Sequence, residues 1–317
     1  LPWERYQFAI IAGVFLRHPG EDDDIYFHEI RDILGRGAGK NGFIDFLALY
    51  FISPYHGVKS YNVDLIANGE EQASTSIVDV GDLIRYPVEQ KYERALNANF
   101  KAYGEKVVGK KMNAVFRLNT SSTKNKDSKR TGCVIYDEKH QYVDTRNMNT
   151  LQSGLGKMKW SREITITTDG HVRGGVLDEE KGQNEVILRE YNPDNRIFVN
   201  WFRIEEEDEW KDIGKIVKAN PSLDDPSFST LRQRIQQEIT KMPFTPDYFP
   251  EFLAKRCNFP ISDPQMAVAE WKDIVECTKE PAFELTQGMI CVGGVDYMKT
   301  NDFCGCVLTF RKGGKYV

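Results

Sequence analysis

The sequence lacks several features that would define a class of protein at once. No uninterrupted apolar run is long enough to span a membrane, and we expect no secretory leader. The six cysteines form no C-x-x-C pair, and the five histidines are not spaced as zinc ligands. These absences argue against a membrane-spanning protein, a disulfide framework and a zinc module, and they favour reduced, buried cysteines in a cytosolic protein.

An excess of either charge is also missing. Lysine and arginine number 42, and aspartate and glutamate number 47, for a net charge of -5. This balance argues against a bulk electrostatic grip on DNA, but leaves room for a local basic surface or a DNA site completed by other subunits. The 317 residues, 40% hydrophobic and 28% charged, indicate a globular protein with two domains, or one large α/β domain with an appendage.

Strand and helix patterns alternate along the first half of the chain. Apolar and β-branched runs predict strands in the second half of 24–34 and at 61–67, 132–138 and 163–168. Helices are predicted at 43–52, from about Glu70, and at 88–102. The alternation predicts an α/β fold with a mainly parallel sheet and helices on both faces, and such sheets carry their active sites at the carboxyl ends of the strands.

The character of the sequence changes after Arg203. An acidic run at 205–210 precedes an amphipathic helix predicted at 227–242, and five prolines between 243 and 264 indicate irregular connecting structure. From Met289 a new strand is predicted, followed by a second strand, a Gly-Gly turn and the start of a third. We interpret this last part as the opening of another domain.

Residues 34–42, "LGRGAGKNG", are similar to the phosphate-binding pattern G-x-x-x-x-G-K-[ST]. Two positions depart from it, because Leu34 stands at the first glycine and Asn41 at the Ser/Thr position. In such a loop backbone N–H groups face phosphate oxygens at a helix N-terminus, and the lysine reaches the β- and γ-phosphates. We predict that ATP contacts a run of loop residues: Gly35, Arg36, Gly37, Ala38, Gly39, Lys40 and Asn41. Alone, the pattern fits a glycine-rich turn before a helix equally well.

Two side chains give this loop an unusual chemistry. Asn41 replaces the hydroxyl that normally binds Mg²⁺, and its carboxamide oxygen, a hard ligand, could bind the ion directly or through a water. Arg36 lies inside the loop, where a guanidinium could stabilise the transferring γ-phosphate.

Two further motifs follow predicted strands. Asp137 and Glu138 end an apolar strand, where Asp137 would hold Mg²⁺ through water and Glu138 would polarise the attacking water. The plain alternative is an acidic turn after a core strand. Thr167 and Thr168, in "TTDGH", could contact the γ-phosphate and report hydrolysis; the alternative is an ordinary strand-to-turn junction.

Basic residues before the Asp-Glu strand suggest contacts outside the chain. Arg130 could act as an arginine finger on the ATP of an adjacent subunit. With Lys124, Lys126 and Lys129, it could instead contact DNA phosphates, or the loop could be merely solvated.

The final strand pattern, "GGVDYMKTND", places Asp296 in an apolar strand, where an unpaired acid is costly. Asp296 could supply the first carboxylate of a two-metal nuclease, with Asp302 a weaker candidate. The alternative is a hydrogen-bonded acid at a strand end.

Taken in order, these motifs resemble the large subunit of tailed-bacteriophage terminases. "GRGAGKN" is similar to the arginine-containing Walker A loop of that family, "VIYDEKHQY" to its Walker B segment and "TTDGH" to its coupling motif. "ANPSL" and "FLAKRCNF" are similar to the stretch that leads out of the ATPase domain, and "GGVDYMKTNDF" to the first strand of the RNase H-like nuclease. The opening "LPWERYQFAIIAGVF" is similar to the segment around the adenine pocket, which makes Gln7 the candidate adenine reader.

The resemblance implies a P-loop ATPase fold of the ASCE type at 1–255, with a lid at 203–255. A linker would follow at 256–287, and the first strands of a truncated RNase H-like domain at 288–317. It implies an ATP- and Mg²⁺-dependent motor that moves double-stranded DNA into a procapsid, and in its full-length form cuts concatemeric DNA with Mg²⁺ or Mn²⁺. The expected partners are viral DNA, the portal protein, the small terminase subunit and further copies in a ring. The expected location is the cytoplasm of an infected bacterial host, outside the mature virion, and no nuclease activity is expected from these residues alone.

Two other readings remain open. One is a helicase-like DNA-dependent ATPase, which should carry a second motor domain with a further arginine motif. The other is an assembly module in which Asn41 has spoiled the metal site, so that ATP binds without turnover.

Overall fold

The structure is a computed structural model, and it describes residues 11, 13–20, 23–67, 70–87, 89–119, 130–141, 152, 154–170, 175–259, 288–296, 305–312 and 315–316. The chain divides into two compact units, Leu1–Asp263 and Pro264–Val317. Each unit is described by itself below.

The first unit is built on an eight-stranded sheet in the order β3-β4-β5-β2-β6-β7-β1-β8. Its strands are β1 (Glu29–Ile33), β2 (Val63–Ile66), β3 (Phe100–Ala102), β4 (Lys106–Gly109), β5 (Ala114–Leu118), β6 (Cys133–Asp137), β7 (Arg162–Thr167) and β8 (Ile197–Trp201). Six neighbouring strands of the sheet pair in parallel, in the order β5, β2, β6, β7, β1 and β8. Strands β3 and β4 add an antiparallel edge beside β5. The prediction of an α/β fold with a mainly parallel sheet is confirmed.

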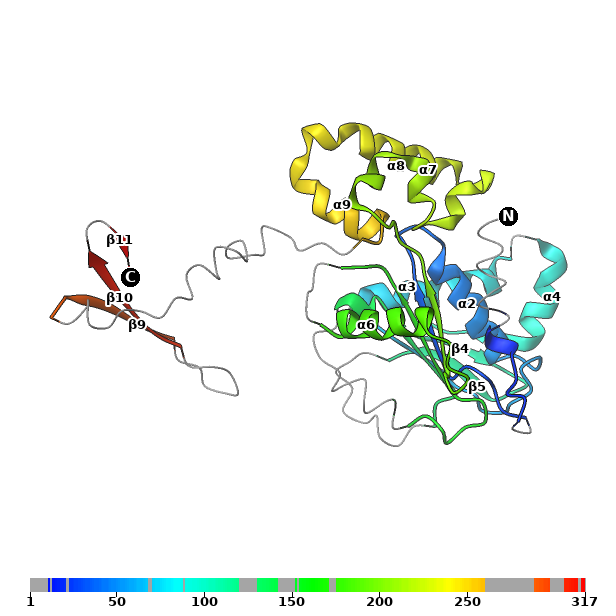
Figure 1. The fold of residues 1–317 in the computed structure, drawn as a ribbon. Coiled ribbons are helices and arrows are strands. Elements are labelled where there is room, and N and C mark those ends of the chain that lie inside the picture. Colours follow the sequence, from blue (N-terminus) through cyan, green and yellow to red (C-terminus); the bar gives the residue numbers. More distant parts are fainter. Residues whose placement is uncertain are drawn as a thin grey trace. The chain divides into compact units, whose positions relative to one another are not determined.

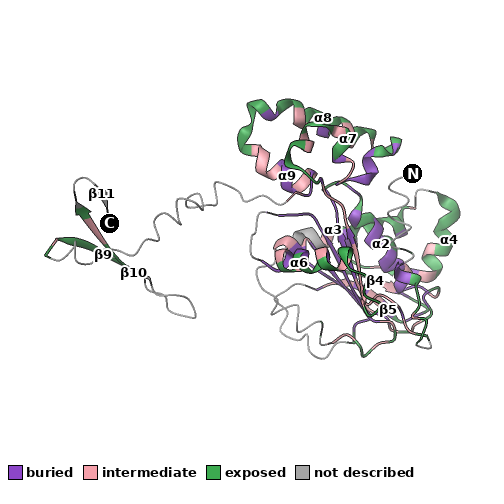
Figure 2. Cartoon of the chain, in the orientation of Figure 1, coloured by how far each residue is buried: buried purple, intermediate pink, exposed green. Residues whose placement is uncertain are grey.

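Helices cover both faces of this sheet. They are α2 (Lys40–Phe51), α3 (Glu70–Arg85), α4 (Gln90–Asn99) and α6 (Val176–Arg189). Figure 1 shows α2 and α6 on opposite sides of the sheet, and α3 packs against both α2 and α4. Figure 2 shows that the buried residues follow the central strands and α2.

The sequence of α2 explains its central place. Its buried apolar residues recur at helical spacing: Phe43, Ile44, Leu47, Ala48 and Phe51. The helix begins after Gly39, whose φ of 82° lies in the left-handed region that glycine adopts without strain. The glycine-rich loop that follows β1 therefore leads directly into α2.

One secondary-structure prediction needs correction. The helix predicted at 88–102 ends at Asn99, and Phe100 begins β3, the first strand of the antiparallel edge. Three buried residues, Phe100 of β3, Val107 of β4 and Phe116 of β5, anchor these short strands to the core. Strands of three to five residues are too short to show a clear period of two in the sequence.

A compact group of helices follows β8. We call residues 204–257 the helical segment; it contains η2 (Glu207–Lys211), α7 (Ile213–Ile216), η3 (Pro221–Asp224), η4 (Pro226–Phe228), α8 (Ser229–Lys241), η5 (Met242–Phe244), η6 (Pro246–Tyr248) and α9 (Phe249–Arg256). It has its own hydrophobic core, which includes Ile216, Leu223, Ile235 and Phe252. The helix predicted at 227–242 corresponds to α8.

The second unit contains three antiparallel strands in the order β11-β10-β9. They are β9 (Cys291–Asp296), β10 (Gly305–Lys312) and β11 (Lys315–Tyr316), as the strand and turn pattern predicted. Val292, Val295 and Leu308 are all more than half exposed within this small sheet. Among the described residues, no helix has the length and apolar character needed to cross a membrane.

Candidate active site

Three loops with the predicted motifs meet at the carboxyl edge of the main sheet. β6, β7 and β1 are adjacent and parallel, and they lead into the Asp137–Glu138 pair, the Thr167–Asp169 turn and the glycine-rich loop. Asp137 of β6 is level with Ile166 of β7, which is level with Asp32 of β1. The three motifs, which lie at positions 34–42, 137–138 and 167–169 of the sequence, are thus neighbours in space.

Lys40 is buried in the loop that carries it. Its Nζ donates to the carbonyl oxygens of Leu34 at 3.0 Å and Gly35 at 3.2 Å, and the side chain is 6% exposed. Burial lowers the pKa of Lys40, although the charges of Glu138, Asp32 and Asp137 act in the opposite direction. An ammonium held near Asp32 and the Asp137–Glu138 pair, at the start of a helix, is well placed to neutralise phosphate oxygens. Arg36 and Asn41, by contrast, are exposed.

The two acids at the end of β6 differ in their electrostatics. Burial raises the pKa of Asp137 to about 6, with the charge of Glu138 adding to the effect and Lys40 opposing it. Burial also acts to raise the pKa of Glu138, but the hydrogen bond and charge of His140, with Lys40 and Arg36, outweigh it, so that the pKa is lowered. Glu138 therefore stays ionised to a lower pH than Asp137, and Asp137 is the acid whose ionised form gains most from a bound cation.

Glu138 also has an unusual backbone. Its φ of 51° lies in the left-handed region, and its N–H donates to Ile166 of β7 at 3.0 Å. A non-glycine residue in this region is costly and is commonly associated with a functional site.

The helical segment holds the glycine-rich loop directly. Gly35 N–H donates to Ala219 O at 2.8 Å, and Arg36 N–H donates to Lys255 O at 2.6 Å. The Arg36 carbonyl in turn accepts from Arg256 Nη1 at 3.2 Å and from Asn220 Nδ2 at 3.3 Å. A Cβ added to Gly35 would lie 2.7 Å from Arg256 O, so only glycine permits this close approach.

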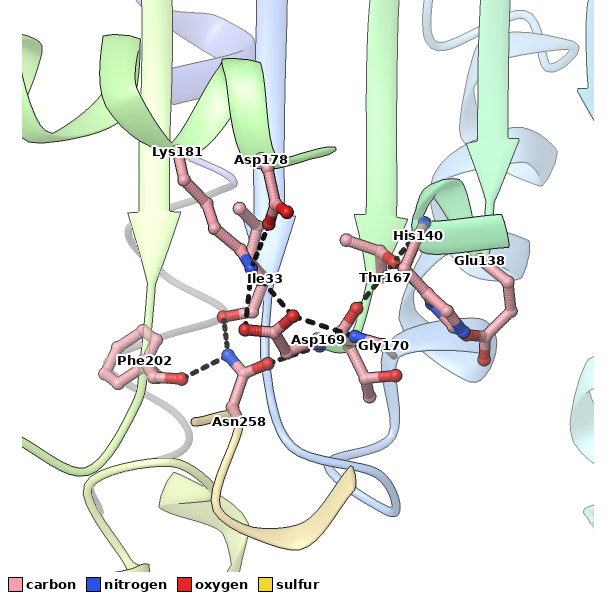
Figure 3. A network of polar contacts seen from close by, with 11 residues as sticks. Ile33, Glu138, His140, Thr167, Asp169, Gly170, Asp178, Lys181, Phe202 and Asn258 are labelled. Carbon is pink, nitrogen blue, oxygen red and sulfur yellow. Dashed lines mark hydrogen bonds and ion pairs between the residues drawn. The ribbon is translucent and has the colours of Figure 1, made fainter. Parts of the chain in front are cut away.

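Asn258, just after the helical segment, ties three strand ends together (Figure 3). Its Nδ2 donates to Ile33 O of β1 at 3.2 Å and to Phe202 O, just after β8, at 2.6 Å, while its Oδ1 accepts from Asp169 N–H, beyond β7, at 2.6 Å. The residue is completely buried, with a φ of 51°. Lys181 of α6 contacts both carboxylate oxygens of Asp169 at 2.7 Å. This network, which the sequence did not reveal, links the coupling-motif turn to the helical segment.

The other predicted site residues fall in different places. Thr168 is buried beside Thr167, whereas Arg130 is exposed at the amino end of β6, at the opposite edge of the sheet from Glu138. Asp296 ends β9, and its side chain is not described. Four candidates lie outside the described residues: Gln7, Lys124, Lys126 and Lys129, as does the weaker candidate Asp302.

Asp45 of α2 provides a test of the electrostatics around this site. Burial raises the pKa of Asp45 to about 7 against a hydrogen bond with Ser76 that lowers it, and the charges of Asp79 and Asp137 add to the rise. The Oδ1 atom of Asp45 has no hydrogen-bond partner. In the folded chain the Asp45 carboxyl therefore keeps its proton up to about pH 7, whereas in the unfolded chain it loses the proton above about pH 4. The free energy of unfolding consequently falls as pH rises from about 4 to about 7. We expect Asp45→Asn to stabilise the fold by about 2 to 4 kcal/mol above pH 7 and by almost nothing below about pH 4.

Chemical denaturation at pH 4, 6 and 8 measures this difference. The exposed Asp247 supplies the matched control, because Asp247→Asn should change stability little at any of the three pH values. A pH-independent effect of Asp45→Asn would contradict the raised pKa.

A parallel sheet with a glycine-rich loop, a buried lysine and an Asp-Glu pair at one edge defines a P-loop nucleoside-triphosphatase fold. Family models agree with this class: that of the terminase large subunit ATPase domain matches residues 6–186, and that of the terminase large subunit endonuclease domain matches 192–317. The chain belongs to the terminase large subunit family. The second match begins before β8 and includes the helical segment.

Individual relatives are more distant. Protein YmfN of Escherichia coli strain K12 is 24% identical over 116 residues, which cover 35% of this chain and 26% of that protein. The large terminase of bacteriophage HK97 superposes with a TM-score of 0.65 at 15% identity, over 98% of this chain and 61% of that one. The chain therefore spans less than two thirds of each of these two proteins, and the likeness to the HK97 large terminase shows a shared fold.

Proposed function

We propose that this chain is the ATP-hydrolysing motor part of a viral terminase that moves double-stranded DNA into a procapsid. The observation that carries the proposal is the grouping of Lys40, Asp137 and Glu138 at one sheet edge, where the glycine-rich loop that carries Lys40 is hydrogen-bonded to the helical segment. A change at the phosphates is thereby connected to a separately packed group of helices. The full-length protein would also cut concatemeric DNA, with Asp296 contributing the first carboxylate of that second site.

The donor set suits Mg²⁺ held together with nucleotide. Among the described residues there is no group of three or more His, Cys, Asp or Glu side chains that could hold a metal. Mg²⁺ in nucleotide sites commonly uses one or two protein oxygens, phosphate oxygens and water. Asp137, whose raised pKa reflects burial beside another carboxylate, and the exposed Asn41 would supply the protein oxygens. When bound, the ion neutralises phosphate charge.

Each residue of the proposed site would have a separate role in ATP binding and hydrolysis. Lys40 binds the β- and γ-phosphate oxygens, with the N–H groups of Gly37, Gly39 and neighbouring loop residues. Arg36 stabilises charge on the transferring group, and Glu138, whose lowered pKa keeps its carboxylate ionised, orients and polarises the attacking water. Thr167 and Thr168 respond to the γ-phosphate. The lid, 203–255, moves relative to the core, and Arg130 reaches the site of an adjacent subunit.

The proposed partners are those of a packaging motor: viral DNA, the portal protein, the small terminase subunit and copies of the same chain in a ring. The motor would work in the cytoplasm of an infected bacterium. The proposed domain limits are 1–255 for the ATPase, 256–287 for the linker and 288–317 for the nuclease strands. The alternatives are a helicase-like ATPase and a nucleotide-binding module without turnover, which the exposed Asn41 at the hydroxyl position favours.

We expect linear duplex DNA to stimulate ATP turnover by the full-length protein several-fold, without strand separation. The measurement pairs phosphate release with a fluorescence assay for unwinding on the same duplex. Stimulation with unwinding would favour the helicase-like reading. No turnover with or without duplex, despite ATP binding, would favour the assembly module.

A further inference from the structure

His140 lies between the Asp-Glu pair and the coupling-motif turn. It belongs to η1 (Lys139–Gln141), which follows Glu138 directly. Its Nδ1 is 3.0 Å from Glu138 Oε2 and 3.1 Å from Thr167 Oγ1, and its backbone N–H donates to the same Thr167 oxygen at 3.2 Å (Figure 3). One side chain thus touches two residues of the proposed hydrolytic site that come from different strands.

The partners determine where the proton of the ring lies. The Thr167 hydroxyl donates to Thr168 O at 2.9 Å, so its oxygen is left to accept from His140. The ionised Glu138 carboxylate, whose Oε2 lies 3.0 Å from His140 Nδ1, can only accept a hydrogen bond. We therefore assign a proton to His140 Nδ1, which donates to Glu138 and Thr167 in one three-centre hydrogen bond.

The surroundings fix this arrangement on two sides. A Cβ on Gly170 would lie 2.3 Å from His140 Cδ2, so the ring rests directly on the backbone of that glycine. The preceding residue, Lys139, is completely buried and forms ion pairs with Glu163 at 3.2 Å and Glu180 at 2.5 Å. Both the ring and its backbone are therefore held while the three-centre bond forms.

We propose that His140 is a positioning residue that ties Glu138 to Thr167, so that the carboxylate is oriented toward water only while the coupling-motif threonine is in place. This inference rests on the proposed function, because it concerns the same hydrolytic site. When Thr167 is displaced, His140 Nδ1–H loses one of its two acceptors and donates to Glu138 alone. The direction of the Glu138 carboxylate then changes. The state of the γ-phosphate, sensed at Thr167, is thereby passed to Glu138.

Steady-state ATP hydrolysis by the full-length protein tests this role. We expect His140→Ala to lower kcat about 10- to 100-fold with KM for ATP changed less than about twofold. His140→Asn places an amide N–H near the position of Nδ1 and should recover most of the lost kcat. A thermal melt of each variant checks that it is folded.

Two further variants test the connection to Thr167. Thr167→Val removes the hydroxyl at nearly constant volume, and its effect on kcat should be strongly non-additive with that of His140→Ala. Gly170→Ala should displace the ring and reproduce a part of the His140→Ala defect. Gly182→Ala in α6, where an added Cβ meets nothing within 4 Å, is the matched control and should be neutral.

The outcomes separate the two proposals. A wild-type protein that binds ATP but never hydrolyses it overturns the proposed function and this inference together. If the wild-type protein turns over ATP normally, three results overturn only the role of His140. These are an unchanged kcat in His140→Ala, additive effects of His140→Ala and Thr167→Val on kcat, and a His140→Ala variant in which only KM rises.

Discussion

Glu138→Gln should abolish ATP turnover while leaving ATP binding nearly intact. The expected fall in kcat is about a thousandfold, because the amide cannot accept a proton or polarise water as the carboxylate does. Glu138 lies beside Lys40 and Arg36, which together with His140 keep its pKa low against the effect of burial. The amide matches the carboxylate in size, so the left-handed backbone at this position and the loop that holds the phosphates should be unchanged.

Phosphate release and equilibrium binding of ATP, measured on the same preparation, check this split. Glu179→Gln is the matched control, since Glu179 is an exposed acid of α6 and its loss should leave kcat unchanged. Retained turnover in Glu138→Gln would contradict the assignment of Glu138, and lost binding would mean that the residue holds the nucleotide.

Asn258→Ala should destabilise the first unit by at least about 4 kcal/mol and weaken the connection between the nucleotide and the helical segment. The substitution leaves the buried carbonyls of Ile33 and Phe202 and the N–H of Asp169 without their partner. Each such loss costs about 1 to 3 kcal/mol, and the left-handed backbone adds about 1 kcal/mol for alanine. For a unit of this size a loss of about 4 kcal/mol corresponds to a fall in Tm of roughly 8 to 16 °C.

Thermal denaturation with and without ATP measures both parts of this prediction. Asn113, in the turn between β4 and β5, is the matched control because it has the same φ of 51° but is exposed. Asn113→Ala therefore carries the backbone cost alone, and Asn258→Gly carries the amide loss alone. Equal effects of Asn113→Ala and Asn258→Ala would show that the three hydrogen bonds of Asn258 contribute nothing.

The sequence predicts the sheet and the location of the site because both depend on local patterns. The apolar runs that form β1, β6 and β7 and the glycine spacing before α2 are visible in a single stretch each. The carboxyl-edge rule for parallel sheets then brings Lys40, Asp137 and Thr167 together without any knowledge of strand order.

What the sequence could not predict depends on contacts between distant residues. Asn258 carries no local signal, and its importance arises from carbonyls 56 and 225 residues away in the chain. His140 was visible in "DEKH", but its contact with Thr167 requires β6 and β7 to be neighbours. The short edge strands β3 and β4 were missed because burial against α3, rather than a repeating pattern, determines them.

Steady-state phosphate release from Mg²⁺-ATP, measured beside ATP binding on the same unmodified protein with duplex DNA present, is the most direct test of the central claim. We expect ATP turnover that saturates with ATP and requires Mg²⁺, with Asn41 binding the ion where the usual loop has a Ser or Thr hydroxyl. Saturable binding without any phosphate release would contradict it, and would make the glycine-rich loop a nucleotide-dependent assembly site.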